Sequence, residues 1–279
     1  MQENLRIILS DLNQAGVQFE IEEEITVLDR RKSESGVENV SGSADSLPAK
    51  SPMAFGSQNG RQKSALDTCG ADDEATKTLI PKMEPVGTGV LASEAQTVAA
   101  DAESMEELLA AIKAFDKMPT AKMAKGIIGP KVGSMGGVLV VVDAPSKADD
   151  EAGELLSGEA RELFSKMMAA IGIDSEDVSV FPVMFHKLPG DRTPTSDELA
   201  VTRAFFDRFV EFLGPTHILT FGQTAFSFVV PGGGNIPKVH GQAFGNVVPT
   251  FGLKTLMTRP EFKKEAWADL QKFREAVGD

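Results

Sequence analysis

The most chemically suggestive residue of this sequence is an aspartate that directly follows an apolar run. Residues 138–142 are all aliphatic, and Asp143-Ala144-Pro145 ends the run. Short apolar runs bounded by turn residues are typical of buried strands in a parallel sheet. In such sheets ligands bind beside the carboxyl ends of the strands. We therefore expect Asp143 to lie where chemistry takes place, as a candidate catalytic carboxylate.

Basic side chains that could contact a phosphate backbone occur in two later segments. Lys187 and Arg192 belong to one loop, and Lys254 and Arg259 belong to residues 238–274, where seven Lys and Arg face three Asp and Glu. Lys and Arg bind nucleic acid by displacing its counterions. The net charge of −13 argues against broad affinity for nucleic acid, so the sequence predicts at most a modest basic face. The alternative is a solvated terminal helix of mixed charge.

The three histidines and one acidic run are further candidates for chemistry. His186 lies beside the basic loop and His240 precedes Gly241, whereas His217 begins an apolar run and is interpreted as a core residue. The acidic run 149–154 could suggest a metal site, but carboxylates in such a loop are more typical of a solvated surface. We predict no metal site.

The elements that must position these residues alternate between strand and helix patterns. Strands are predicted at 138–143, 178–184, 217–221 and 246–250, and helices at 156–171, 195–213, 223–229 and 260–277. Capping boxes at Ser104/Glu107 and Thr195/Glu198 mark two helix starts. Alternating strands and helices favour a parallel sheet covered on both faces. The predicted fold is α/β, a three-layer α/β/α sandwich with a four-stranded parallel sheet.

The composition divides the chain into three parts. Residues 1–30 include apolar side chains at helical spacing over 4–19, which predicts an amphipathic helix segment that could dock a protein partner. Residues 31–102 are rich in Ser, Gly, Ala and charges, and we interpret them as a disordered linker. Residues 103–279 form the predicted folded domain.

Compartment and membrane association follow from absences in the sequence. No run of 18 apolar residues occurs, so no membrane span is predicted. The amino terminus lacks the basic region and cleavage site of a signal peptide. We expect a cytoplasmic protein without a membrane partner.

Four blocks of sequence, in order, resemble the iron–sulfur (family 4-like) uracil-DNA glycosylases over about residues 114–273. The family's Gly-Glu-Ala-Pro-Gly after the first strand is matched by residues 142–146, and its Pro-Gly-Asn-Arg-x-Pro loop by residues 189–194. Residues 222–225 and 249–270 follow at the family's spacing. The resemblance implies a uracil-DNA glycosylase-like fold, a base pocket that includes Ala144 and Pro145, and a function related to DNA base-excision repair.

The resemblance also implies that much of the chemistry is lost. A family Glu that serves water or cation chemistry is replaced by the shorter Asp143, and a Phe that stacks on the extruded base by Leu156. An Asn that reads the base edge is replaced by Pro182, and a His that stabilises the leaving base by Gly252. Base excision needs a base that leaves the stack, is recognised along its polar edge and departs as a stabilised anion. We therefore predict impaired catalysis.

The same comparison predicts that the iron–sulfur cluster is absent. Clusters are held by cysteine thiolates, usually four, and the chain has one cysteine, Cys69, in the predicted linker. Met118 occupies what resembles one ligand position of the family. We expect no cofactor.

Three functional hypotheses remain open. The favoured one is a degenerate relative that acts as a DNA-associated or interaction module, with DNA contacts from Lys187, Arg192, Lys254 and Arg259. The alternative is a divergent active uracil-DNA glycosylase in which Asp143 activates water and His240 or His186 replaces the missing donor. A scaffold without DNA contact suits the net charge of −13.

Overall fold

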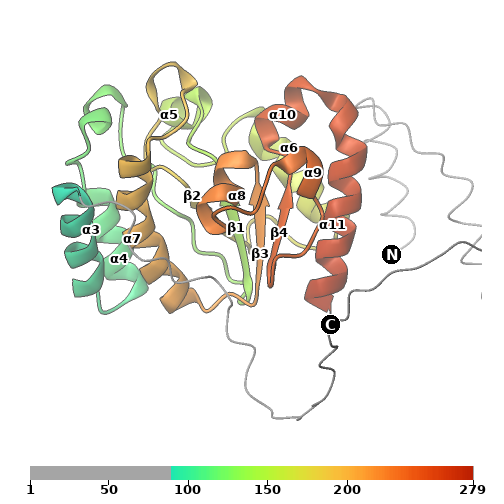
Figure 1. The fold of residues 1–279 in the computed structure, drawn as a ribbon, viewed down its shortest axis with the longest axis horizontal. Helices are drawn as coiled ribbons and strands as arrows, with labels where there is room; N and C mark the ends of the chain where they lie inside the picture. Colours follow the sequence, from blue (N-terminus) through green and yellow to red (C-terminus); the bar gives the residue numbers. More distant parts are fainter. Residues whose placement is uncertain (1–88, 279) are drawn as a thin grey trace, which may run out of the picture. The chain divides into compact units, whose positions relative to one another are not determined.

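The computed structural model describes residues 89–278, which form a four-stranded parallel sheet between two layers of helices (Figure 1). The strands are β1 (Val138–Val142), β2 (Ser179–Pro182), β3 (His217–Phe221) and β4 (Val247–Thr250), in the order β2-β1-β3-β4. The register pairs Val142 with Pro182 and Phe221, and Phe221 with Thr250. The carboxyl ends of all four strands therefore lie at the same end of the sheet. The predicted α/β/α sandwich is confirmed.

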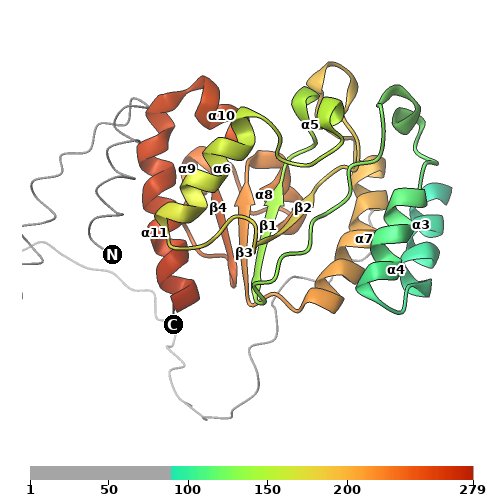
Figure 2. The same ribbon diagram turned by 180° about the vertical axis from the view of Figure 1, so that it is seen from behind.

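Helices cover both faces of this sheet. One layer contains α3 (Val90–Asp101), α4 (Met105–Ala114) and α7 (Ser196–Leu213). The other contains α6 (Glu159–Ala170), α10 (Leu253–Thr258) and α11 (Lys263–Gly278), as the view from behind shows (Figure 2). Short elements between the strands are α5 (Lys147–Ala152), α8 (Gln223–Val229), α9 (Ile236–Val239) and the 3₁₀ turn η2 (Pro189–Asp191). The 3₁₀ turn η1 (Pro119–Met123) precedes β1, and η3 (Pro260–Phe262) separates α10 from α11.

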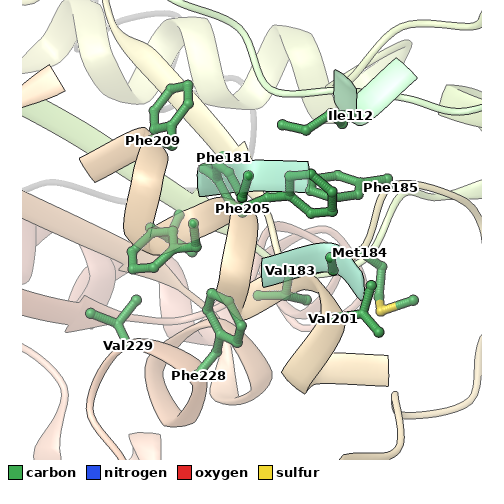
Figure 3. Packing of buried hydrophobic residues seen from close by; sticks show 14 of the residues in the cluster. Ile112, Phe181, Val183, Met184, Phe185, Val201, Phe205, Phe209, Phe228 and Val229 are labelled. Carbon is green, nitrogen blue, oxygen red and sulfur yellow. The ribbon is translucent and has the colours of Figure 1, made fainter. Parts of the chain in front are cut away.

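The core explains why β1 is apolar at every position. Leu139 and Val141 pack into the cluster under α7, while Val138, Val140 and Val142 pack into the cluster under α6 and α11. The first cluster is rich in phenylalanine, with edge-to-face contacts at ring-centroid distances of 5.0 to 5.7 Å (Figure 3). A strand buried on both faces has no polar side and shows no alternation.

Most predicted elements are confirmed, with small shifts at their ends. The capping box of Thr195 with Glu198 opens α7 as predicted. The helix predicted over 156–171 begins only at Glu159, because residues 153–158 form a loop. Helix α5 was not predicted, although Ser146 and Asp149 form a capping box at its start.

The predicted linker boundary needs correction. The helix segment 1–30 and most of the linker 31–102 lie outside the described residues, but residues 90–101 are not linker: they form α3. Ala92, Ala95 and Ala99 are buried on one face of α3, which packs against α7. Alanines at spacings of three and four residues form a narrow apolar stripe that permits close helix packing. Composition alone does not reveal this stripe, because alanine is counted there together with Ser, Gly and the charged residues of a linker.

Candidate functional site

Asp143 directly follows the carboxyl end of β1, and its carboxyl group lies against Gly222 after β3 and Gly252 after β4. Its Oδ1 accepts a hydrogen bond from the backbone N–H of Ala225 at 3.0 Å. A Cβ placed on Gly222 would lie 2.2 Å from Asp143 Oδ2, and one on Gly252 would lie 3.3 Å from it. The carboxyl group therefore fills the space that side chains at 222 and 252 would need. Through the Ala225 N–H, this residue at the end of β1 also caps the first turn of α8, the helix that follows β3.

This environment changes the acidity of Asp143. Burial raises its pKa to about 6, while hydrogen bonds from the backbone of Ala225 and Thr224 lower it in part. A carboxyl group with such a pKa is still mainly ionised at neutral pH and is a stronger base than an ordinary aspartate. The same group can thus cap a helix and accept a proton.

Two other predicted pocket positions lie at the same edge and contribute no polar side chain. Pro182 ends β2 and is buried, and Gly252 follows β4 and is buried as the N-cap of α10. Neither residue has a side-chain donor or acceptor. The structure thus places Asp143, Pro182 and Gly252 at the same end of the sheet, as the parallel topology predicts, and Asp143 lies against Gly252.

The remaining pocket candidates belong to the loop on either side of α5. Ala144 is partly buried and Pro145 is buried just before α5. Leu156, in the loop after α5, is partly buried and has a φ of 58°, a left-handed conformation that is rare for a branched residue. Backbone strain of this kind persists only where surrounding contacts impose it.

Asp149 supplies those contacts and shows that the acidic run is partly structural. It is 4% exposed and accepts hydrogen bonds from the backbone N–H of Ser146 at 2.8 Å and of Ser157 at 2.6 Å. Its carboxylate therefore joins the start of α5 to the residue after Leu156. The interpretation of the run as a solvated surface is therefore wrong at Asp149, whose carboxylate is buried and bound to backbone N–H groups.

The four predicted DNA-contacting residues differ in their surroundings. Lys187 Nζ and Lys254 Nζ each lie 2.9 Å from a different carboxylate oxygen of Asp191. Arg192 donates two hydrogen bonds to Glu198, at 2.8 and 2.6 Å. Arg259 is exposed at the end of α10. Three of the four cations thus already face an intramolecular carboxylate.

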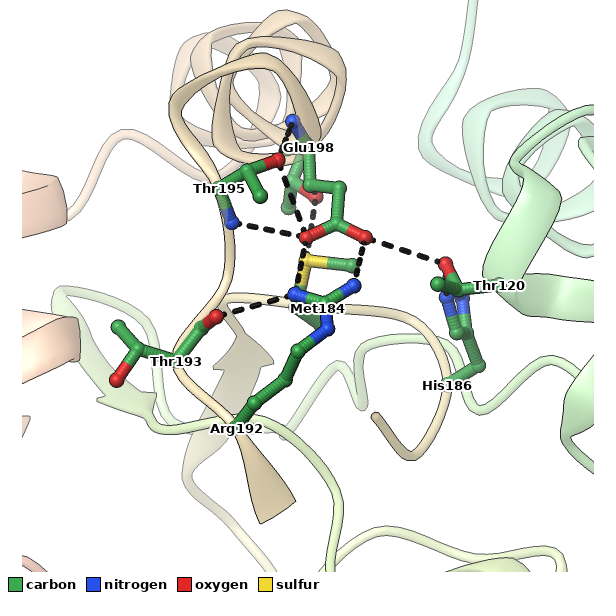
Figure 4. A network of polar contacts seen from close by, with 8 residues as sticks. Thr120, Met184, His186, Arg192, Thr193, Thr195 and Glu198 are labelled. Carbon is green, nitrogen blue, oxygen red and sulfur yellow. Dashed lines mark hydrogen bonds and ion pairs between the residues drawn. The ribbon is translucent and has the colours of Figure 1, made fainter. Parts of the chain in front are cut away.

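Glu198 is the centre of a polar network at the start of α7 (Figure 4). The bidentate contact from Arg192 holds the pKa of Glu198 at about 2, against the effect of its partial burial. Thr120 Oγ1 donates to Glu198 at 3.4 Å and lies 2.6 Å from His186 Nε2. The network therefore links η1 to the loop that follows β2.

His186 serves this network and is sealed from solvent. It is 1% exposed, and burial lowers its pKa. A neutral, buried imidazole is poorly placed to donate to a ligand outside the protein. His217 lies at the amino end of β3, opposite the candidate site, with its Nδ1 3.0 Å from Thr216 Oγ1.

His240 has a partner that the sequence analysis missed. Its Nδ1 lies 2.9 Å from Oδ1 of Asp269, which is 1% exposed and also accepts a hydrogen bond from Thr250 at 2.8 Å. Burial raises the pKa of Asp269, and the hydrogen bonds from His240 and Thr250 lower it. A signal existed in the sequence, since Asp269 is a polar residue on the helical face shared by Ala266 and Phe273.

The described residues do not fit an iron–sulfur cluster. Met118 is 3% exposed within the apolar cluster, and it lines a cavity of about 200 Å³ with Leu91, Pro119 and Val201. A thioether is not the thiolate that such clusters require. Within residues 89–278 no group of three or more His, Cys, Asp and Glu could hold a metal ion. Over the same residues, no helix is both long enough and apolar enough to cross a bilayer.

The sequence is similar to a known protein family and to several of its members. Residues 131–271 match the family model of the uracil DNA glycosylase superfamily. The type-4 uracil-DNA glycosylase of Thermotoga maritima is 29% identical over 148 residues, which are 50% of this chain and 77% of that protein. The type-4 uracil-DNA glycosylase of Archaeoglobus fulgidus is 26% identical over 189 residues, 63% of this chain and 94% of its own length. That of Pyrobaculum aerophilum is 31% identical over 123 residues, which are 44% of this chain and 61% of that protein.

Proposed function

The chain belongs to the uracil DNA glycosylase superfamily, and from that premise we propose that it is a DNA-associated member with strongly impaired base excision. Its relatives relate it to DNA repair. The further claims, that it binds DNA and that its excision chemistry is reduced, are our proposal. We also propose that it works in the cytoplasm without a cluster, and that residues 1–30 contact a protein partner.

The observation that carries this proposal is the composition of the strand ends. The outer strand β2 ends at Pro182, and Gly252 lies just after the outer strand β4. Neither residue supplies a polar side chain to read a base or to stabilise it as it leaves. A single lost donor to a developing anion costs roughly 10²–10³ in rate. Losing the group that reads the base edge as well, with Leu156 offering no aromatic face for stacking, supports a much larger loss.

A second candidate function deserves a test because of the state of Asp143. With a pKa of about 6, this carboxyl group has the basicity expected of a group that activates water near neutral pH. His240 has its Nδ1 fixed by Asp269, so its Nε2 remains for another partner. These two groups support a divergent active glycosylase as the alternative.

A gel-based excision assay on uracil-containing single- and double-stranded oligonucleotides tests both candidates. The proposal expects product at background level for the wild type and for Asp143→Asn alike. Asn keeps a side-chain oxygen for the Ala225 N–H and lacks only the basic carboxylate. The control is Glu176→Gln, an exposed carboxylate beside Lys131 that precedes β2.

The alternative gives a different pattern in the same assay. Ready excision by the wild type and by Glu176→Gln, abolished in Asp143→Asn, would replace the impaired module with a divergent enzyme. If neither excision nor salt-dependent DNA binding is seen, the scaffold without DNA contact takes their place.

A further inference from the structure

Asp191 connects loops that arise from opposite edges of the sheet. Lys187 and Asp191 belong to the connection between β2 and α7, and Lys254 belongs to the first turn of α10, directly after β4. Asp191 Oδ1 lies 2.9 Å from Lys187 Nζ, and its Oδ2 lies 2.9 Å from Lys254 Nζ. β2 and β4 are the outer strands. This one carboxylate therefore links loops from both sides of the sheet, at the carboxyl end where Asp143 lies.

The two ammonium groups are arranged as they would be around a phosphate. Each one approaches a separate oxygen of the same anionic group, from a different loop. Lys187 is held in place, because its Nζ also donates to the carbonyl of Leu188 at 3.1 Å and its side chain is only 21% exposed. Lys254 is 75% exposed and can follow a larger anion. A tetrahedral phosphate has the charge and oxygens to replace the carboxylate.

The backbone of Asp191 fits a positional role for this residue. Its φ is 52°, and that of Gly190 is 64°. Left-handed backbone is uncommon for residues other than glycine, and Asn and Asp tolerate it best. Asn at position 191 would therefore keep the loop conformation while removing the charge.

We propose that Lys187 and Lys254 form a subsite for a DNA backbone phosphate, and that the Asp191 carboxylate occupies it as an intramolecular competitor. This inference rests on the proposed function, in which the chain binds DNA. Bound DNA must displace Asp191 before both lysines can reach a phosphate. The wild type therefore binds weakly because it is self-blocked, and not because it lacks cations.

The contact of Asp191 with Lys254 is an exposed ion pair, so the block is modest and reversible. Exposed ion pairs contribute little to stability because water and salt screen them. Lys187 and Lys254 hold the pKa of Asp191 below its ordinary value through their hydrogen bonds. The carboxylate consequently stays charged at neutral pH, and a strongly anionic ligand relieves the block.

The test measures binding of a fluorescent single-stranded oligonucleotide to the full chain by anisotropy. Asp191→Asn should bind about three- to tenfold more tightly than the wild type at low salt, the factor expected from the loss of one weak intramolecular competitor. Between about 50 and 200 mM salt, the log–log slope should steepen by roughly 0.7, the value for one more neutralised phosphate on a single strand. The double variant Asp191→Asn/Lys254→Gln should lose this gain.

Glu176→Gln is the matched control for net charge. Glu176 also lies between two cations, Lys131 and Arg161, but it precedes β2 at the opposite end of the sheet. A gain for Asp191→Asn alone supports the subsite. An equal gain for both variants, or no binding by Asp191→Asn, overturns it.

The outcomes separate this inference from the proposed function. If the wild type binds DNA and Asp191→Asn binds no more tightly, the subsite is refuted and the proposed function stands. If Asp191→Asn binds and the wild type does not, self-blocking is supported. A final measurement adds inorganic phosphate to the complex of Asp191→Asn with the oligonucleotide at constant ionic strength. If inorganic phosphate displaces the oligonucleotide, the assignment to backbone phosphate is wrong.

Discussion

The substitution Gly222→Ala tests whether the Asp143 carboxyl group is part of the packing at the sheet edge. Gly222 follows β3 with φ 102° and ψ 166°, a region that is essentially restricted to glycine. The new Cβ would lie 2.2 Å from Asp143 Oδ2, far inside contact distance. Asp143 must therefore move and give up its hydrogen bond to Ala225.

The expected cost follows from these two effects. Sparsely populated backbone costs about 1–3 kcal/mol, and a lost hydrogen bond to a charged group costs about 1.5–3 kcal/mol. We expect Gly222→Ala to lower the free energy of unfolding by roughly 3–5 kcal/mol. A loss of this size is a large fraction of the roughly 5–15 kcal/mol that stabilises a typical domain.

Urea unfolding at neutral pH measures this cost, and Gly172→Ala is the matched control. Gly172 has a φ of 78°, but a Cβ there would meet nothing within 4 Å. The control should therefore show only backbone strain, about 1–2 kcal/mol. In the background of Asp143→Ala, which removes the carboxyl group, Gly222→Ala should cost only its backbone strain, about 1–3 kcal/mol.

Two results would contradict a shared volume for Asp143 and a side chain at position 222. Equal destabilisation by Gly222→Ala and Gly172→Ala would mean that the carboxyl group moves aside without loss. A double-mutant cycle with no coupling between positions 143 and 222 would mean that they do not compete for one volume.

Three further predictions concern pH, packing and cofactor. Because the folded state raises the pKa of Asp143 from 3.8 to about 6, its contribution to stability is full below the lower value and is lost as the pH rises through the higher one. The unfolding free energy of the wild type relative to Asp143→Asn should thus rise by on the order of 3 kcal/mol from about pH 7 to about pH 4 in urea titrations. A flat difference would contradict the burial of this group. Ala95→Glu, on the buried face of α3, should destabilise by roughly 2–4 kcal/mol, whereas Ala100→Glu on the exposed face should be nearly neutral; similar melting curves would contradict the packing of α3. Purified protein should lack absorbance near about 400 nm, and stoichiometric iron and sulfide would show the cofactor prediction to be wrong.

The sheet and its helices could be predicted from the sequence because each signal is local. The apolar run of β1 and the Thr195/Glu198 cap of α7 lie within a few residues of the elements they define. The parallel topology then places Asp143, Pro182 and Gly252 at one edge without any knowledge of side chains. That part of the candidate site follows from chain order.

The contacts that decide how the site behaves are not local. Asp191 meets Lys254 across 63 residues, and the Asp143 carboxylate meets the Ala225 N–H across 82. No spacing rule links such pairs, because their approach depends on how two loops fold over the edge. Helix α3 was not predicted for another reason. Alanine contributes little hydrophobicity, and its burial depends on the partner helix.

The shared volume at the end of β1 has a consequence for engineering. Positions 143, 222 and 252 lie far apart in the chain, yet a change at one is constrained by the other two. A glutamate at 143 reaches one methylene further, so its carboxyl group cannot occupy the same space. Asp143→Glu alone is therefore poorly accommodated. A library that redesigns this site should vary the three positions as a unit, together with the first turn of α8.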